Sequence, residues 1–218
     1  MITQQLEEFR NELREKIKEK KNIDVKNNTK LNYLATFKKH DEYRSPDCAW
    51  DDILKYIDKD KYKIWMPFYL DGKCGKYIKS LGYAVYHPAK KDFFNYIPND
   101  YLGKLRKRNN KEWILLDGAP FSLTKEIMQR CVNIKMPFVL LMPPGRIDNN
   151  YTREIFKNTK IQLKILNPKP YKFTKFIEGS YLGGAIKTDK TTNFKCYWYC
   201  WGISEIYDLK CNYTGTYI

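Results

Sequence analysis

The sequence predicts a single α/β domain built around a mostly parallel sheet. Patterns typical of strands and helices alternate from residue 48 onward, which favours such a sheet over separate helical and β regions. Residues 137–142 are almost continuously apolar, as in a parallel strand that is buried on both faces. An apolar strand at 63–67 leads into a turn that contains Gly72 and Gly75, a common strand-to-helix connection in these sheets. The 218 residues suffice for one such domain with short extensions.

The chain divides into an N-terminal helix and linker at 1–30 and an α/β domain at 31–218. Apolar residues at 2, 6, 9, 13 and 17 recur at spacings of three and four, which predicts an amphipathic helix over 2–20. A polar linker follows at 22–30. The apolar face of this helix either packs on its own domain or serves a partner protein or self-association.

The elements of the α/β domain follow from periodicity and turn residues. We expect about six or seven strands in the sheet, with the strand at 63–67 at its centre. The expected elements are a helix at 48–57, a strand at 63–67, a helix at 75–81, strands at 83–87 and 112–116, a helix at 123–133, a strand at 137–142, a helix at 150–156, and strands at 161–166 and 193–201.

The charge balance favours a polyanionic partner. The chain has 40 Lys and Arg against 25 Asp and Glu, a net charge of +15. Two basic stretches contain no acidic residue, and aromatic residues are interleaved in the second, which suits phosphate contacts and base stacking. We therefore expect nucleic-acid binding, with a merely solubilising Lys-rich surface as the alternative. The predicted contacts are Lys104, Arg106, Lys107, Arg108 and Lys111 in the first stretch and Lys169, Lys172 and Lys175 in the second, which also holds Tyr171, Phe173 and Phe176.

Cysteine and histidine usage argues against a metal site. The six cysteines form no CxxC pair, and the chain has two histidines, so we predict reduced thiols in an intracellular setting, such as a host cytoplasm or nucleus or a virion. The first residues are polar and charged, unlike a signal peptide. No run of about 18 apolar residues occurs, so no membrane partner is expected.

A set of short motifs gives the α/β pattern a more specific interpretation. In order, they read DEYRSP at 41–46, MPFYLDG at 66–72, LGY at 81–83, DFF at 92–94, APFS at 119–122, PFVLLMP at 137–143 and YWYC at 197–200. Together they resemble the Dam-like DNA N6-adenine methyltransferases of phages and large DNA viruses, over roughly residues 41–201. The resemblance implies a Rossmann-type methyltransferase fold and methyl transfer from S-adenosylmethionine to the amino group of adenine.

The resemblance also implies positions for the cofactor. The residues that match the family's cofactor-binding motifs are Ser45, Pro46, Pro67, Phe68, Asp71, Gly72, Asp92 and Phe93. Two family acids are absent: Met66 stands where an acidic residue normally precedes Pro-Phe, and Pro88 follows the second strand, where an acid commonly holds the ribose. We therefore expect binding of S-adenosylmethionine to be weak or lost. Asp92 itself has an alternative as a turn residue or helix N-cap.

The catalytic loop departs furthest from the family pattern. The family carries Asn or Asp, two prolines and an aromatic residue, which hold the adenine amino group and stack on the flipped base. The implied catalytic positions here are Asp117, Gly118, Ala119, Pro120 and Phe121. Gly118 has no side-chain acceptor, although Phe121 can stack, the Ala119 carbonyl can accept one bond, and Asp117 can substitute if the loop shifts by one residue. Loss of one such hydrogen bond typically slows catalysis about 100- to 1,000-fold.

Three possibilities therefore remain open from the sequence, the third being an unrelated α/β protein, such as a structural virion protein or a ribosome-associated protein. The first is a catalytically impaired methyltransferase-fold protein that binds nucleic acid or supports a partner enzyme. The second is an active adenine-N6 methyltransferase with an unusual loop, acting on DNA or RNA.

Overall fold

The computed structural model describes residues 41, 43–89, 91–98, 101, 111–167, 169–176, 187–207 and 214–216. The predicted helix at 2–20 and the linker at 22–30 lie outside these residues. So do Lys104, Arg106, Lys107 and Arg108. None of the described helices is long and apolar enough to cross a membrane.

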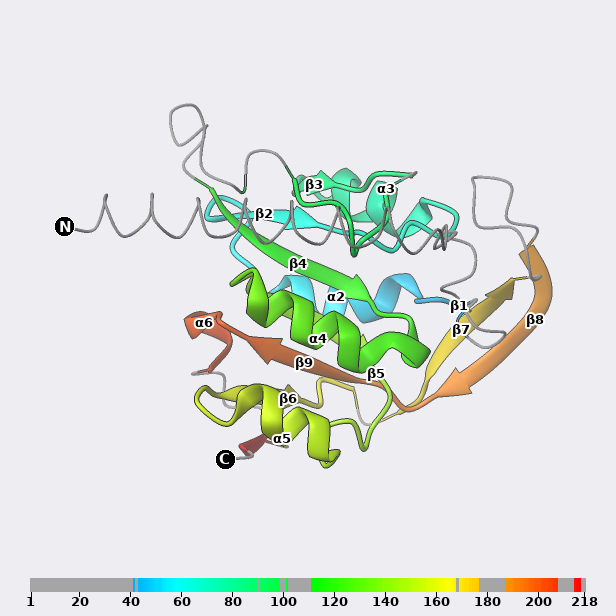
Figure 1. Ribbon diagram of the computed structural model, residues 1–218. Coiled ribbons are helices and arrows are strands. Elements are labelled where there is room, and N and C mark those ends of the chain that lie inside the picture. Colours follow the sequence, from blue (N-terminus) through cyan, green and yellow to red (C-terminus); the bar gives the residue numbers. More distant parts are fainter. Residues whose placement is uncertain are drawn as a thin grey trace, which may run out of the picture.

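A mixed, mostly parallel sheet forms the centre of the described chain (Figure 1). Its seven strands lie in the order β10-β6-β9-β5-β4-β2-β3. β3, β2, β4 and β5 pair in parallel, whereas β9 is antiparallel to both β5 and β6, and β10 is antiparallel to β6. The strands are β2 (Tyr62–Trp65), β3 (Ala84–Tyr86), β4 (Glu112–Gly118), β5 (Phe138–Met142), β6 (Ile161–Lys164), β9 (Tyr197–Trp201) and β10 (Thr214–Thr216).

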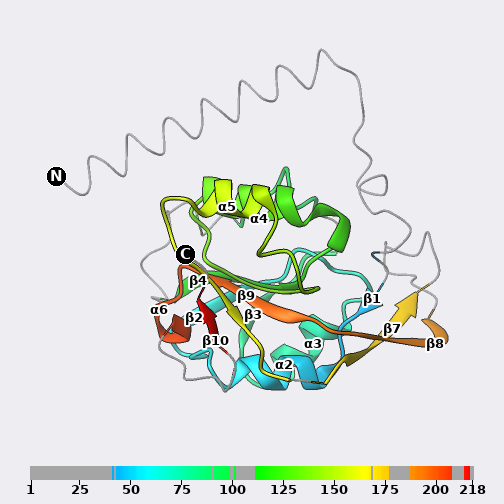
Figure 2. The same ribbon diagram turned by 90° about the horizontal axis from the view of Figure 1, so that it is seen from below.

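Helices cover both faces of this sheet, in three layers (Figure 2). Alternate strand residues feed two cores: Ile114 and Leu116 of β4 join one, whereas Trp113 and Leu115 join the other. α2 (Asp47–Leu54) and α3 (Lys73–Ser80) contribute to the first core. α4 (Thr124–Asn133) and α5 (Asn150–Phe156) contribute to the second. All five residues of β5 are buried, as its apolar run predicts.

A second, three-stranded sheet stands beside the carboxyl ends of β2 and β4. It has the order β1-β7-β8, both pairs antiparallel, and β7 and β8 form a hairpin that extends away from the main sheet (Figure 1). Its strands are β1 (Tyr43–Arg44), β7 (Tyr171–Phe176) and β8 (Lys187–Phe194). After β9, the short helix α6 (Ser204–Tyr207) ends the continuous described chain.

The α/β class and most of the predicted elements are confirmed, with three corrections. β2 lies next to the edge strand β3 and not at the centre, because the chain adds four further strands beyond β4. The aromatic segment at 193–201 is not one strand: it breaks at Lys195–Cys196, where the chain passes from the small sheet into the main one. The small sheet itself was not predicted.

The connections of the sheet define one crevice. From β2 the chain moves to β3 on one side, and β4 then lies on the other side of β2. The helix after β2 packs on one face, and the helix after β4 packs on the opposite face. Ligands of doubly wound sheets bind beyond the carboxyl ends of the strands at such a switch point. The fold therefore places the expected site between the ends of β2 and β4.

Candidate functional site

A cavity lies at this switch point. Its volume of about 40 Å³ has room for a few water molecules, since each needs roughly 10–15 Å³. The loops after β2 and β4 form two walls, and the small sheet with α2 and α3 forms the others. The lining residues are Asp41, Tyr43, Arg44, Ser45, Trp50, Phe68, Tyr69, Leu70, Cys74, Asp117, Gly118, Ala119, Pro120, Phe121, Leu141 and Phe173.

Asp117 is the buried carboxylate of this cavity. It ends the apolar run of β4 with 3% of its surface exposed. Its Oδ2 accepts a hydrogen bond from the Phe68 amide at 2.9 Å, and its Oδ1 accepts one from the Gly118 amide at 2.8 Å. Burial raises the pKa of Asp117 well above its usual value, against the effect of these two amides. Asp117 therefore ties the loop after β2 to the end of β4.

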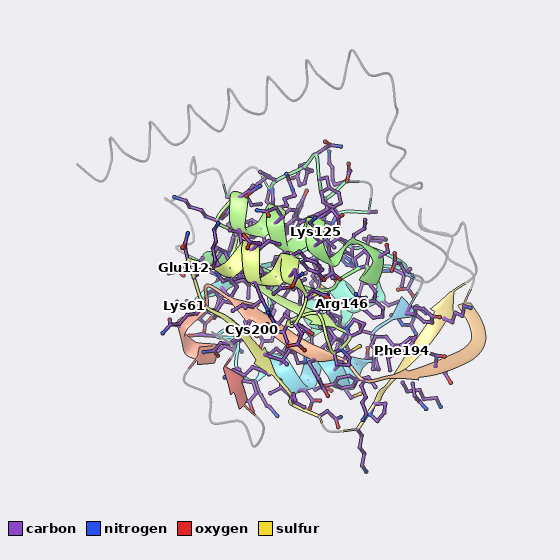
Figure 3. All side chains as sticks on the ribbon, turned by 60° about the horizontal axis from the view of Figure 1, so that its bottom comes forward. Lys61, Glu112, Lys125, Arg146, Phe194 and Cys200 are labelled. Atoms are coloured by element: carbon purple, nitrogen blue, oxygen red, sulfur yellow. The ribbon has the colours of Figure 1, made fainter. Side chains whose placement is uncertain are left out.

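The rest of the catalytic segment lies on the same wall. Gly118 lies close to Ser45, the residue after β1: a Cβ at position 118 would lie 2.7 Å from Ser45 Oγ. Ala119 and Pro120 are buried, and Phe121 begins the 3-10 helix η2 (Phe121–Leu123). Phe121 is half-buried, with its ring edge-to-face with Phe194 at a centroid distance of 6.0 Å. Figure 3 shows Phe194 where the β7–β8 hairpin joins the main body.

Arg44 and Asp41 each contact a loop beside the cavity. Arg44 Nη1 lies 2.6 Å from Asp71 Oδ2, and their side chains are only 17% and 11% exposed. The backbone amide of Ser122 donates to Asp41 Oδ1 at 3.0 Å, and its hydroxyl donates to Asp41 Oδ2. Asp71, which the resemblance assigns to cofactor binding, is thus held by an arginine of the same chain.

Side chains of the chain itself cover the glycine turn after β2. A Cβ at Gly72 would lie 2.5 Å from the Tyr69 hydroxyl, and Gly72 has a φ of +74°. A Cβ at Gly75 would lie 2.0 Å from His87 Nδ1. The Tyr69 and His87 rings lie 4.6 Å apart between centroids. The two glycines therefore allow a close approach, but the approaching groups are Tyr69 and His87.

Several predicted cofactor positions do not line the cavity. Pro46 is the N-cap of α2, and Pro67 is buried. Asp92 forms a turn, since its Oδ1 accepts from the Phe94 amide at 3.0 Å and its Oδ2 accepts from the Asn95 side chain. Phe93 is buried against Phe68, with ring centroids 5.3 Å apart. Ser45, Phe68 and the segment 117–121 are the predicted residues that the fold brings together.

Met66 is fully buried in the core that α2 and α3 share with the sheet, and it is not a lining residue of the cavity. Its amide donates to the Tyr86 carbonyl at 2.9 Å, which continues the pairing of β2 with β3. An acidic side chain at this position would be buried in apolar surroundings.

The predicted nucleic-acid contacts that the structure describes, Lys111, Lys169, Lys172 and Lys175, lie at two ends of the molecule. Lys111 precedes β4, and its ammonium donates to the Lys59 carbonyl at 2.7 Å. In Figure 3, Lys61 and Glu112 mark this end and lie far from Phe194. Lys172 and Lys175 belong to β7 at the other end, with Lys169 just before it.

The aromatics of the second basic stretch need a correction. Tyr171 and Phe173 are 2% exposed and belong to the core, so they do not present stacking faces on the basic surface. Lys164 of the same stretch is also buried. The side chains of YKFTKF alternate between apolar and basic, which is the pattern of a strand with one buried face. That signal predicts the burial of Phe173, and only the fold shows that Phe173, Trp50 and Cys74 line the cavity.

The fold and the site define the class of protein as α/β, with a mixed, mostly parallel sheet and a cavity at its switch point. In comparisons with known proteins, no protein-family model, curated protein or solved structure matched the chain. Within the part of the chain that the structure describes, no group of three or more His, Cys, Asp or Glu side chains is placed to hold a metal ion.

Proposed function

We propose that this chain is a Rossmann-type methyltransferase-fold protein that binds nucleic acid and whose methyl-transfer chemistry is impaired. The observation that carries the proposal is the order of the sheet together with the place of the cavity. The parallel strands, numbered in chain order, run 2-1-3-4-5, a doubly wound order with its ligand site between strands 1 and 3. The antiparallel strand β9 lies between β5 and the last parallel strand, β6.

The segment that the resemblance assigns to catalysis supports the proposal by its position. Residues 117–121 line the cavity at the carboxyl end of β4. A base that entered there would meet the Phe121 ring, which is only half-buried. The arrangement thus suits stacking on an adenine, as in enzymes that act on a flipped base.

The hydrogen-bond acceptors in the cavity wall support the proposal that methyl transfer is impaired. Gly118 offers no side chain, and the close approach of Ser45 Oγ opposes any larger residue there. Each oxygen of Asp117 already accepts a backbone amide, so this carboxylate serves as a brace between two loops. A substrate amino group would have to share Asp117 with these amides.

An active adenine-N6 methyltransferase is the second candidate, and one observation favours it. Asp117 lies in the cavity wall next to the Ala119–Phe121 segment, so a substrate base in this cavity would lie near its carboxylate. A carboxylate oxygen has room for a second hydrogen bond. Asp117 would then orient the amino nitrogen toward the methyl group.

Methyl transfer by the unmodified chain separates the two candidates. We expect transfer of tritiated methyl from S-adenosylmethionine to adenine-containing DNA or RNA to stay near background. Phe194→Leu is the matched control for Phe121→Leu, because both rings belong to one edge-to-face pair and only Phe121 lines the cavity. Robust turnover that falls at least tenfold in Phe121→Leu, and not in Phe194→Leu, would establish the active enzyme and reject the impaired one.

A further inference from the structure

Two aromatic rings cover the glycine turn after β2, and neither belongs to the segment 117–121. Tyr69 lies over Gly72, and His87, the first residue after β3, lies over Gly75 in the first turn of α3. Any side chain at either glycine would collide with these rings, at 2.5 Å and 2.0 Å respectively. The glycines are therefore required by the presence of the two rings.

The place of the two rings is the place where a doubly wound sheet receives its ligand. The turn joins the carboxyl end of β2 to α3, at the switch point, where glycines normally let a ligand approach the backbone. Tyr69 also lines the cavity of about 40 Å³ at this switch point. The Tyr69 ring thus belongs both to the wall of this cavity and to the cover of the glycine turn.

The His87 ring is poorly satisfied in this position. Within the described part of the chain, its Nε2 is buried and has no hydrogen-bond partner. Burial lowers the pKa of His87 to about 4, helped by Lys79 and opposed by the Phe68 backbone and Asp71. A buried polar atom without a partner costs free energy. Movement of the His87 ring into water would remove this cost.

We propose that Tyr69 and His87 form an aromatic plug, which fills a slot for the flat ring of a nucleoside and must move aside before such a ligand binds. The two rings lie at a centroid distance of 4.6 Å with their planes tilted by 43°, so together they fill the space over the glycine turn. The choice of an adenine nucleoside rests on the proposed function. The plug itself rests only on the contacts of Tyr69, His87 and the two glycines.

The test is the binding of S-adenosylmethionine to the full chain by titration calorimetry. We expect Tyr69→Ala with His87→Ala to bind at least tenfold more tightly than the unmodified chain, because the energy needed to displace the rings is removed. Tyr77→Ala is the matched control: this tyrosine lies on α3, after the turn, and its hydroxyl donates a hydrogen bond to Asp51 of α2. Equal affinities for the folded double variant and the unmodified chain would overturn the proposal.

A second measurement keeps the plug testable if the double variant fails to fold. The chain has two histidines, so proton NMR with His40→Gln identifies the His87 resonance. In the plug, His87 titrates near pH 4, and Gly75→Ala, whose Cβ would meet Nδ1 at 2.0 Å, moves its pKa toward the ordinary 6.5. Titration near 6.5 in the unmodified chain would show that the ring is not held there. The methyl-transfer assay tests the proposed function, whereas the His87 titration tests the plug whatever that assay gives.

Discussion

At the scale of single residues, Asp117 connects two loops that are 49 residues apart in sequence. It is nearly fully buried, and both of its oxygens accept backbone amides. Asp58 makes a comparable pair of amide bonds, from Asp60 and Lys61, but it is exposed. Loss of a buried acceptor leaves its donors without partners, whereas water replaces an exposed one.

We therefore expect Asp117→Ala to lower the free energy of unfolding by about 2–3 kcal/mol, since two buried amides lose their acceptor. Asp117→Asn keeps one oxygen and should cost at least about 1 kcal/mol less than the alanine. Asp58→Ala, the control, should cost under about 1 kcal/mol. Urea unfolding monitored by tryptophan fluorescence measures all three. If Asp117→Ala and Asp58→Ala lower the free energy of unfolding equally, the hydrogen bonds of Asp117 contribute little to stability.

At the scale of elements, the two-residue strand β1 carries more of the site than its length suggests. It places Arg44 against Asp71 and precedes Ser45, whose hydroxyl faces Gly118. β1 pairs with β7, so these contacts anchor the hairpin sheet to the turn that begins α3. The opposite charges are mostly removed from water, which makes their interaction stronger than that of an exposed pair.

A double-mutant cycle on Arg44 and Asp71 measures this anchor. The coupling energy from Arg44→Ala, Asp71→Ala and the double variant should be about 1–2 kcal/mol, the range for contacting charged residues. The exposed pair Glu154–Lys157, at 3.6 Å with side chains 76% and 64% exposed, is the control and should give at most about 0.5 kcal/mol. A coupling for Arg44 and Asp71 no larger than that of the control would refute a strong anchor.

At the scale of the whole molecule, the chain has a net charge of +15, and the described lysines of its two basic stretches lie at opposite ends of the molecule. The hairpin end has the better geometry for a nucleic acid, because Lys169 and Lys172 are exposed, and Lys175 partly so, on the sheet that borders the cavity. Lys111, at the other end, already donates to a backbone carbonyl. We therefore expect the hairpin end to supply the productive phosphate contacts.

Charge reversal tests that expectation. Lys169→Glu, Lys172→Glu and Lys175→Glu together should weaken binding to a short single-stranded DNA. They should also flatten the dependence of log K on log salt by up to roughly 2, since each lost phosphate contact removes about 0.7 from the slope. The control reverses Lys55, Lys59 and Lys125, which are exposed and change the net charge equally. If fluorescence anisotropy shows the same loss for both triple variants, net charge alone governs binding.

Much of the fold could be predicted from local patterns. The helix at 150–156 has the predicted bounds, and the strand at 137–142 differs from β5 by one residue. Such elements are visible because burial on one or both faces leaves a periodic or continuous apolar run. The small sheet was missed because β1 has two residues and β8 reads KTDKTTNF, which carries little apolar pattern. In addition, β1 pairs with β7, whose residues are more than 100 positions away in the chain.

The sequence by itself determined the α/β class, the glycine turn after the first parallel strand and the segment 117–121 at the end of β4. These features follow from residue type and local spacing, which act over a few residues. Only the tertiary structure decided that Asp117 braces the Phe68 loop, that Met66 is buried in the core and that Tyr69 and His87 cover the two glycines. Those roles depend on which groups approach through space, and the order of the strands sets that approach.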